Sequence, residues 1–441
     1  MMRRGRGGSA TRYCLVAVMS ALAVSAPQAA ALPADSWESS VLLRSFYDRL
    51  SPSSGLPRFG ALQAQQWRTQ ASRRVGGIDA GVDAAVFGAL RLDGSSNAGN
   101  RTLVAPDGTT SHRTSWAYPA LAALSVASDH AQVKAGLQAV NNPFLQPDET
   151  RALPPTFRGI SASMQPALDT VLEAGSFNAT IARGQESARS LTTSYGGTKV
   201  DRFEYVGGHG GSDAISQVFL VGRARDVWRQ AFSSTSIRLG ESPLGIARAK
   251  LNVYVTRGDG RQLQGPIDTT AASVAFSTGT PAASATLGLQ QIFGNQVFDY
   301  LAETNGIFLA NVYGGDYNAP HERSVQLRLR MNGAVFGLAG LDLGAWATSG
   351  WKADASKEAA LHPEPADALH KLYWRNGRSA QGTNRELGMR VAYRFSSGCL
   401  KGAQVWLMTM AHRQSLNYPG SAYDKTQFVL QVPIGLGQGP L

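Results

Sequence analysis

Cysteine and charge are both scarce in this chain, and its mature part has no long apolar run. Only Cys14 and Cys399 occur among the 441 residues. Cys14 lies in a segment that we expect to be removed, so Cys399 remains alone and no intramolecular disulfide can form. Charged residues make up 17% of the chain, below the roughly 25% of soluble domains. No segment after residue 31 reaches about 18 uninterrupted apolar residues, which excludes membrane-spanning helices.

Sequence motifs for catalysis and for cofactor binding are also missing. The chain has no G-x-S-x-G elbow, and its seven histidines are dispersed without the spacing of metal ligands. The glycine cluster at 207–211 is not followed by Lys-Ser/Thr, so we interpret it as a turn and not as a phosphate loop. Separate Ser, His and Asp residues could still meet in three dimensions, but their presence carries almost no information. We therefore expect no cofactor, no metal and no catalytic residue.

The N-terminus has the plan of a secretory signal peptide. Four arginines precede an apolar run at 14–26, and small residues follow at 29–31. This run is too short for a membrane anchor, so we predict a signal peptide over residues 1–31 with cleavage before Leu32. Removing it leaves 38 basic and 31 acidic side chains, and the net charge falls from +11 to +7. The basic residues are scattered, which argues against a nucleic-acid surface.

Residues 324–332 show the clearest local pattern. Apolar residues alternate strictly with Gln326, Arg328, Arg330 and Asn332. Period two is typical of a β-strand with one apolar and one polar face. Such a strand fits a transmembrane barrel, and it also fits a soluble antiparallel sheet with one wet face.

The rest of the chain decides between these two. Residues 78–91 repeat the alternation and leave Asp79, Asp83 and Arg91 on the polar face. Similar runs continue to residue 436, separated alternately by short turns and by longer polar loops such as 94–114, 141–159, 302–323 and 352–383. Unequal connections at the two ends are typical of an outer-membrane barrel. Since no linker interrupts the pattern, we predict an all-β fold in which residues 32–441 form one transmembrane antiparallel β-barrel.

Several ordered motifs resemble one family of channels. They are the run D-E-T-R-A-L-P-P-T-F-R-G at 148–159, then G-I-D-A-G-V-D at 77–83, Q-V-K-A-G at 132–136, D-R-F-E-Y at 201–205, D-V-W-R-Q at 226–230 and E-R-S at 322–324. Together they resemble the OprD-like family of substrate-specific outer-membrane porins, over roughly residues 39–436. No single motif is decisive, but their shared order is specific.

This resemblance implies a barrel of about 18 strands, monomeric or trimeric, with an external loop folded into the lumen. Residues 142–159 would be that loop, carrying Arg151 and Arg158. An arginine ladder would guide carboxylates past the constriction, and acidic groups would accept a cationic portion of the solute. The constriction residues implied in this way, or placed on polar strand faces, are Arg328, Arg330, Arg390, Arg394, Arg413, Arg151, Arg158, Asp79 and Asp83. Arg248 and Lys250 lie on a further polar face beside Asn252 and Tyr254.

Two departures from the family pattern stand out. Trp406 and Met408 occupy positions where the resemblance implies arginines, and only Arg413 is retained in that strand. The ladder is therefore shortened or moved to Arg390 and Arg394. The family's final aromatic is also missing, because residues 435–441 follow the last expected strand. Phe428 is the candidate replacement.

The sequence thus predicts a passive channel for small carboxylate-bearing or zwitterionic solutes, embedded in outer-membrane lipid and without a nucleic-acid partner. Fixed charges in a narrow pore replace part of a solute's hydration, and weak multiple sites let it leave again. Two alternatives remain open at this point. One is an outer-membrane barrel hydrolase resembling a protease, and the other is a structural or adhesive barrel with a closed lumen.

Overall fold

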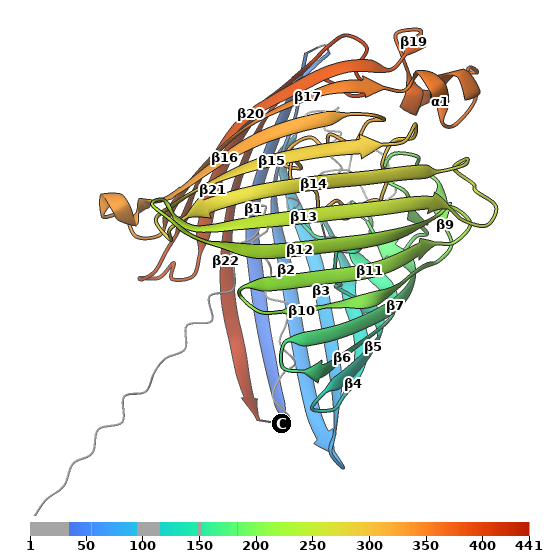
Figure 1. Ribbon diagram of the computed structural model, residues 1–441. Helices are drawn as coiled ribbons and strands as arrows, with labels where there is room; N and C mark the ends of the chain where they lie inside the picture. Colours follow the sequence, from blue (N-terminus) through green and yellow to red (C-terminus); the bar gives the residue numbers. More distant parts are fainter. Residues whose placement is uncertain (1–34, 54, 95–114, 148–151, 183, 441) are drawn as a thin grey trace, which may run out of the picture.

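A computed structural model describes residues 35–440, except 54, 95–114, 148–151 and 183. The predicted signal peptide and Arg151 lie outside the described residues. Eighteen strands form one antiparallel sheet, which closes because the first strand pairs with the last. The prediction of an 18-stranded antiparallel barrel is therefore confirmed. Figure 1 shows the order of the strands around the sheet.

The barrel strands follow one another around the wall in chain order. They are β1 (Ser36–Pro52), β2 (Arg58–Val75), β3 (Ile78–Gly94), β4 (Ser115–Ala127), β5 (Ala131–Gln138), β6 (Thr156–Ala167), β7 (Thr170–Ile181), β10 (Phe203–Gly211), β11 (Ile215–Ala224), β12 (Trp228–Ser242), β13 (Gly245–Gly258), β14 (Asp268–Gly279), β15 (Ala283–Phe293), β16 (Arg323–Asn332), β17 (Leu341–Asp354), β20 (Gln381–Arg394), β21 (Gln404–Gln414) and β22 (Tyr423–Pro440). Smaller elements are the strand pairs β8 (Leu191–Thr192) with β9 (Lys199–Val200) and β18 (Trp374–Arg375) with β19 (Arg378–Ser379), and the helices η1 (Gly333–Phe336), α1 (Ser356–Leu361) and α2 (His370–Tyr373).

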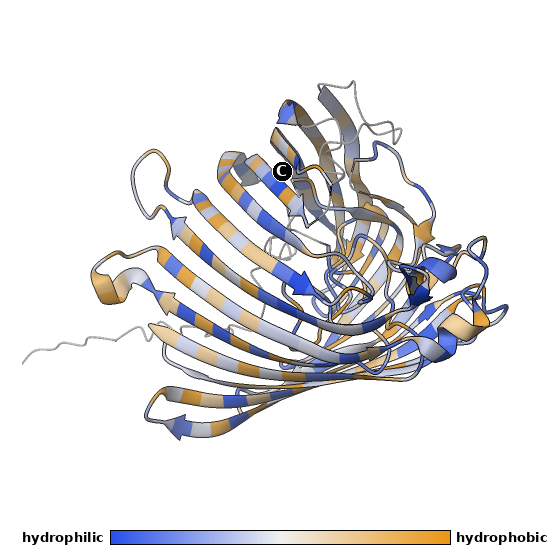
Figure 2. Cartoon of the chain, turned by 90° about the horizontal axis from the view of Figure 1, so that it is seen from above, coloured by the Kyte–Doolittle hydropathy of each residue, from blue (hydrophilic) through white to orange (hydrophobic). Residues whose placement is uncertain are grey.

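Alternating exposure along the strands separates a lumen face from an outer face. In β16, Leu327 and Leu329 are about half exposed, whereas Ser324 and Gln326 are buried. Figure 2 shows the same alternation of polar and apolar residues along the strands. An apolar outer face over a polar lumen face is the pattern of a barrel that meets lipid. Among the described residues, no helix is long and apolar enough to cross a membrane.

The two ends of the barrel differ. The start of β1 and the end of β22 lie at one end, where Ser36 pairs with Pro440 and connections such as 76–77 and 168–169 are short. We call this the short-turn end. The opposite, long-loop end carries the connections 139–155, 182–202, 294–322 and 355–380. These two ends correspond to the two sides of the membrane.

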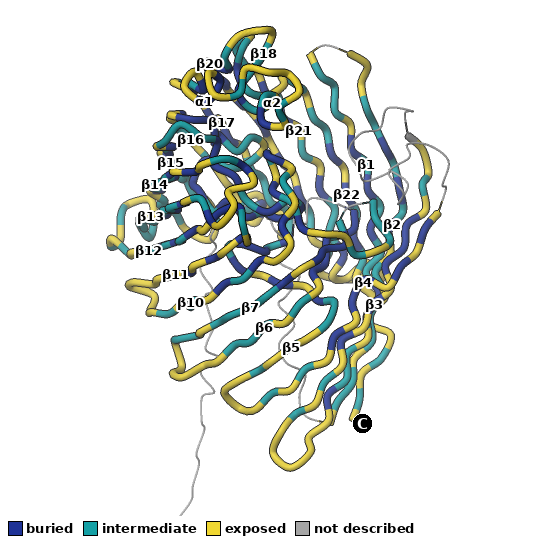
Figure 3. The backbone as a smooth tube through the Cα atoms, turned by 90° about the vertical axis from the view of Figure 1, so that its right-hand side faces the viewer, coloured by how far each residue is buried: buried dark blue, intermediate teal, exposed yellow. Residues whose placement is uncertain are grey.

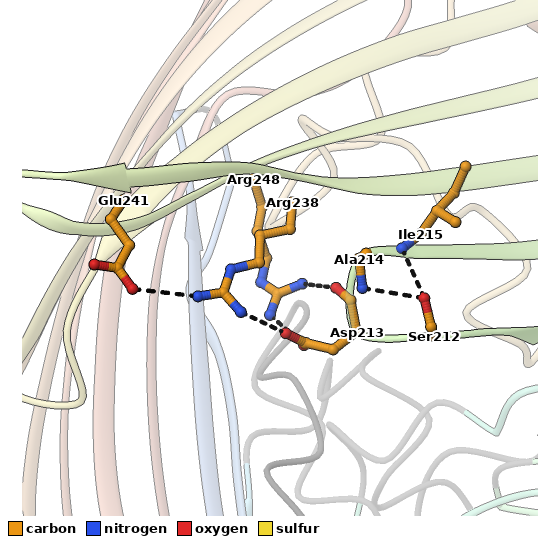
Figure 4. A network of polar contacts seen from close by, with 7 residues as sticks. All are labelled: Ser212, Asp213, Ala214, Ile215, Arg238, Glu241 and Arg248. Atoms are coloured by element: carbon orange, nitrogen blue, oxygen red, sulfur yellow. Dashed lines mark hydrogen bonds and ion pairs between the residues drawn. The ribbon is translucent and has the colours of Figure 1, made fainter.

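Figure 4 shows how one connection at the short-turn end is held. Asp213, in the turn between β10 and β11, binds Arg238 at 3.0 Å and Arg248 at 2.6 Å. Arg238 also reaches Glu241 at 3.4 Å, and the Ser212 hydroxyl accepts the N–H of Ala214 at 3.3 Å. Two strands, β12 and β13, therefore fix this turn.

The glycine cluster 207–211 is a strand and not a turn. It forms the second half of β10 and pairs with both β7 and β11. A Cβ on Gly207 would clash with the carbonyl oxygen of Phe219, and one on Gly208 with that of Val171. Glycine is required here because neighbouring backbones approach closely, so our prediction of a turn was wrong.

The C-terminal residues 435–440 also belong to the wall. They extend β22 to Pro440 and pair with the first residues of β1. The sequence pattern predicted the end of this strand at residue 436, with residues 435–441 as an addition to the family pattern. Phe428 lies on the outer face of β22, opposite Tyr47, and is 40% exposed.

Candidate functional site

Connection 294–322 folds into the lumen. Its residues Phe298, Leu301 and Ile307 are buried in a cluster with side chains of β6 to β15. Figure 3 views the barrel from the long-loop end. It shows loop segments inside the barrel, between strands β10–β17 on one side and strands β1–β4 on the other. The sequence predicted an ordinary polar loop at 302–323, without this inward role. The apolar run Ile307-Phe-Leu-Ala310 was the available signal.

Hydrogen bonds from the wall hold this loop along its length. The hydroxyl of Tyr254 accepts the N–H of Phe308 at 3.1 Å, and the hydroxyl of Ser273 accepts that of Ala310 at 3.0 Å. Buried backbone N–H groups need such partners, because leaving one unpaired costs about 1–3 kcal/mol. The loop is therefore part of the folded barrel and not a loose covering.

Glu386 of β20 also anchors loop 294–322 to the wall. Its buried carboxylate accepts the N–H groups of Gly314 at 3.2 Å and Gly315 at 2.8 Å, and also the indole N–H of Trp346. Hydrogen bonds to a carboxylate are stronger than those between neutral groups. The ring of Tyr313 packs against that of Trp346 at a tilt of 48°, with 4.2 Å between the ring centroids.

Connection 139–155 folds inward as well, which confirms the predicted inward loop in this part of the chain. Phe144 and Leu145 are buried, and their N–H groups both reach the side-chain oxygen of Asn142 at 3.0 Å. The carbonyl of Ala152 accepts a hydrogen bond from Arg44 of β1 at 3.4 Å. The predicted boundary needs correction, because β6 begins at Thr156 and residues 156–159 belong to the wall.

Connection 182–202 completes the set of inward loops. The carboxylate of Asp299 accepts N–H groups from Tyr195 at 2.9 Å, Gly196 at 2.9 Å and Tyr300 at 2.8 Å. Burial raises the pKa of Asp299 although these bonds oppose the shift. Asp316 accepts the hydroxyls of Tyr195 at 2.7 Å and Tyr300 at 2.6 Å.

The three inward loops are bonded to one another as well as to the wall. Pro147 forms an antiparallel bridge with Thr304, and Thr193 forms one with Leu301. We call connections 139–155, 182–202 and 294–322 together the constriction loops. Because they meet inside the lumen, they reduce the cross-section open to a solute.

Three cationic side chains on the lumen face have no ion-pair partner in the part of the chain that the structure describes. They are Lys250 of β13, Arg328 of β16 and Arg390 of β20. The guanidinium of Arg390 lies over the ring of Trp406, 5.3 Å from its centroid. We call these three residues the free cations.

Arg330 differs from the free cations because Asp342 of β17 neutralises it. Their nearest nitrogen and oxygen atoms are 2.6 Å apart. Gly344 pairs with both Arg330 and Arg390 in the strand register, and a Cβ added to it would meet only the carbonyl oxygen of Leu329, at 4.0 Å. Arg394 is the last residue of β20, at the short-turn end, and is exposed.

Arg158 and Arg413 do not join this group. Arg158 lies on the outer face of β6, exposed, with its side chain bonded to Asn178 at 3.2 Å. Arg413 lies on the outer face of β21 at the long-loop end and pairs with Asp424 at 2.7 Å. The lumen face of β21 instead carries Trp406, Met408 and His412.

The two predicted aspartates are both ion-paired. Asp83 is buried in the wall and binds Arg68 at 2.8 Å and Lys134 at 2.5 Å. Asp79 binds Arg74 at 2.8 Å near the short turn 76–77. Sequence reasoning did not single out Arg68, Lys134 or Glu386, because single charges on strand faces carry no distinctive motif.

The closed barrel with a polar lumen and three inward loops is the architecture of an outer-membrane channel. The chain belongs to the OprD family of outer membrane porins, whose family model matches residues 61–436. It is an outer-membrane protein of a Gram-negative bacterium, and because this is a family of porins and not of enzymes, the hydrolase alternative is excluded.

Relatives agree with this assignment. The chain is 26% identical to Porin D of Pseudomonas aeruginosa, over 90% of each chain. It is 27% identical to the porin-like protein GalP of Pseudomonas putida, over 76% of this chain and 83% of that protein. The crystal structure of Pseudomonas aeruginosa OccD3 (OpdP) matches with a TM-score of 0.77 and 27% identity, covering 91% of this chain and 92% of that one.

Proposed function

We propose that the channel passes small anionic or zwitterionic nutrients, such as carboxylates and amino acids, and that its free cations attract their carboxylate groups. The observation that carries the proposal is the lack of an ion-pair partner for Lys250, Arg328 and Arg390 among the described residues of a lumen narrowed by loops. A guanidinium binds a carboxylate through two parallel hydrogen bonds, so an unpaired arginine suits this solute.

The free cations act through the potential that they create. Positive charges in a narrow pore with low-dielectric walls raise the local concentration of anions. At about 0.1 M salt the screening length is about 10 Å, whereas at 1 M it is about 3 Å. Anion preference should therefore be stronger at low salt. Arg330 contributes less than the free cations because Asp342 compensates its charge.

The test is to change Arg328 and Arg390 together to Gln and to measure the zero-current potential across planar bilayers in a salt gradient. We expect a shift toward cations that is larger at low salt. Arg158→Gln is the control for position, because it removes one arginine charge from the outer face instead of the lumen face. No shift in a correctly folded double variant, or an equal shift in the control, would overturn the proposal.

A barrel with a closed lumen is the second candidate, favoured by the bridges among the constriction loops. Single-channel conductance separates the two functions. A folded barrel that inserts into bilayers without conducting would support the closed lumen. We further propose that residues 1–31 are removed on export.

A further inference from the structure

Three exposed arginines lie on the outer face at the long-loop end of the wall segment β16–β17–β20–β21. They are Arg323 of β16, Arg385 of β20 and Arg413 of β21. Arg385 pairs with Arg413 in the register. Arg323 pairs with Trp351, two residues beyond Ser349, which pairs with Arg385. We call Arg323, Arg385 and Arg413 the outer arginine cluster.

The outer arginine cluster lies where the apolar part of each strand ends. On the same outer face, toward the short-turn end, follow Leu327 in β16, Leu387 in β20 and Leu407 in β21, which are 46%, 66% and 47% exposed. A charged side chain is costly within the hydrocarbon layer and favourable at its edge. Aromatic residues such as Trp351 are enriched at this boundary. The cluster is therefore at headgroup level on the extracellular side.

Most of the charge of this cluster is uncompensated. Arg323 and Arg385 have neither a hydrogen bond nor an ion pair from their side chains to the described part of the chain, whereas Arg413 binds Asp424. The arginines on the outer face of β11, β12 and β13 show the opposite arrangement. At the same end of β11, β12 and β13, Arg223 and Arg229 both bind Asp259, and Arg257 binds Asp268 at 2.7 Å.

We propose that the outer arginine cluster binds the phosphate groups of a lipid headgroup in the outer leaflet. Guanidinium groups bind phosphate oxygens in pairs and gain most where water is partly excluded. The exposed leucines beneath the cluster contact the acyl chains of the same lipid. This combination favours a phosphate-bearing lipid over free phosphate, because free phosphate has no acyl chain to contact the apolar surface. The site lies outside the pore and is independent of the solute that passes through.

The test uses bisphosphorylated lipid A as the probe, with the full-length mature barrel in detergent and native mass spectrometry of the adduct. Arg323→Gln combined with Arg385→Gln should weaken the apparent affinity about tenfold, equivalent to about 1.4 kcal/mol. Arg257→Gln is the control, since it removes an outward arginine that already has a partner. It should bind lipid A like the parent protein. Lipid A without its phosphates should bind parent and double variant equally weakly.

Competition by inorganic phosphate and comparison of the variants decide whether the cluster binds a lipid. Excess inorganic phosphate should leave the lipid adduct in place, and displacement would show a site for free anions and overturn the lipid assignment. Equal affinity of parent and double variant, or equal loss in Arg257→Gln, would also overturn the proposal. Heat-modifiable migration on gels verifies that each variant is folded. Ion selectivity of the double variant should match the parent protein, which separates this site from the pore.

Discussion

The carboxylate of Glu386 on β20 accepts the backbone N–H of Gly315 at 2.8 Å and thereby ties the longest inward loop to the barrel wall. Replacing Glu386 with Ala leaves this N–H, the N–H of Gly314 and the indole of Trp346 without their acceptor. Each such loss costs about 1–3 kcal/mol. We expect loop 294–322 to loosen, single-channel conductance to rise and protease cleavage within the loop to increase. Glu386→Gln keeps one acceptor oxygen, so its conductance and protease cleavage should lie between those of the parent protein and those of Glu386→Ala. Unchanged conductance and cleavage in Glu386→Ala would contradict the anchoring role.

The ion pair between Arg330 and Asp342 predicts a gain of anion preference. Asp342→Asn removes the compensating carboxylate and frees Arg330 on the lumen face. The zero-current potential should then move toward anions, opposite to the change expected for Arg328→Gln. Arg330→Gln in the parent protein should have a smaller effect than Arg328→Gln. If Asp342→Asn leaves selectivity unchanged at low salt, Arg330 does not act on passing ions.

Shortening the first inward loop should widen the pore. Residues 143–153 can be replaced by a short Gly-Ser connection without removing any residue of β6, which begins at Thr156. We expect higher conductance and weaker discrimination between solutes, because buried side chains such as Phe144 and Leu153 leave the lumen. Liposome swelling with solutes of increasing size measures this. Equal or lower conductance in a folded variant would count against the obstruction.

The buried carboxyl group of Glu322 should make the stability of the folded barrel depend on pH. This residue precedes β16, is fully buried and accepts the Tyr418 hydroxyl at 3.0 Å. Burial raises its pKa from 4.5 to about 8, so the folded state binds the proton more tightly than the unfolded state. Its contribution to stability is complete below pH 4.5 and is lost as the pH rises toward 8. Thermal unfolding in detergent should show this decline in the parent and a flatter profile in Glu322→Gln. Parallel profiles would refute the assignment.

Export makes a simple prediction about the mature chain. If residues 1–31 are a signal peptide, the protein isolated from outer membranes begins at Leu32. Intact-mass measurement determines this directly. A mass that includes residues 1–31 would exclude cleavage.

The sequence predicted the wall better than the lumen. Strict alternation identified β16 and its faces, because period two requires only local information. Arg413 shows the limit of the same rule. It stands one residue out of phase with Trp406 and Met408, and a shift of one residue places a side chain on the opposite face. Comparing the position of Arg413 with those of Trp406 and Met408 would have placed Arg413 on the outer face, whereas Arg390 lies on the lumen face.

The inward loops could not be predicted in the same way. Contacts such as Pro147 with Thr304 join residues far apart in the chain, and no periodic pattern encodes them. The resemblance to the family implied only the loop at 142–159, and for connection 294–322 the sequence shows only that residues 307–310 are too apolar for an ordinary exposed loop. Which strands receive such a segment depends on closure of the sheet. The pairing of the arginines could not be predicted for the same reason. Asp342 neutralises Arg330 but not Arg328, and this is seen only when β16 and β17 lie side by side.

The bridges between the constriction loops have a kinetic consequence. A loop bonded only to the wall could swing out of the lumen alone, and the pore would then widen by degrees. Here each of the loops 139–155 and 182–202 is bridged to loop 294–322, so loop 294–322 moves far only after both bridges, Pro147 with Thr304 and Thr193 with Leu301, have separated. The three loops therefore rearrange as one cooperative unit. Current through a single molecule should switch between a few discrete levels, with dwell times set by the breaking of these bridges.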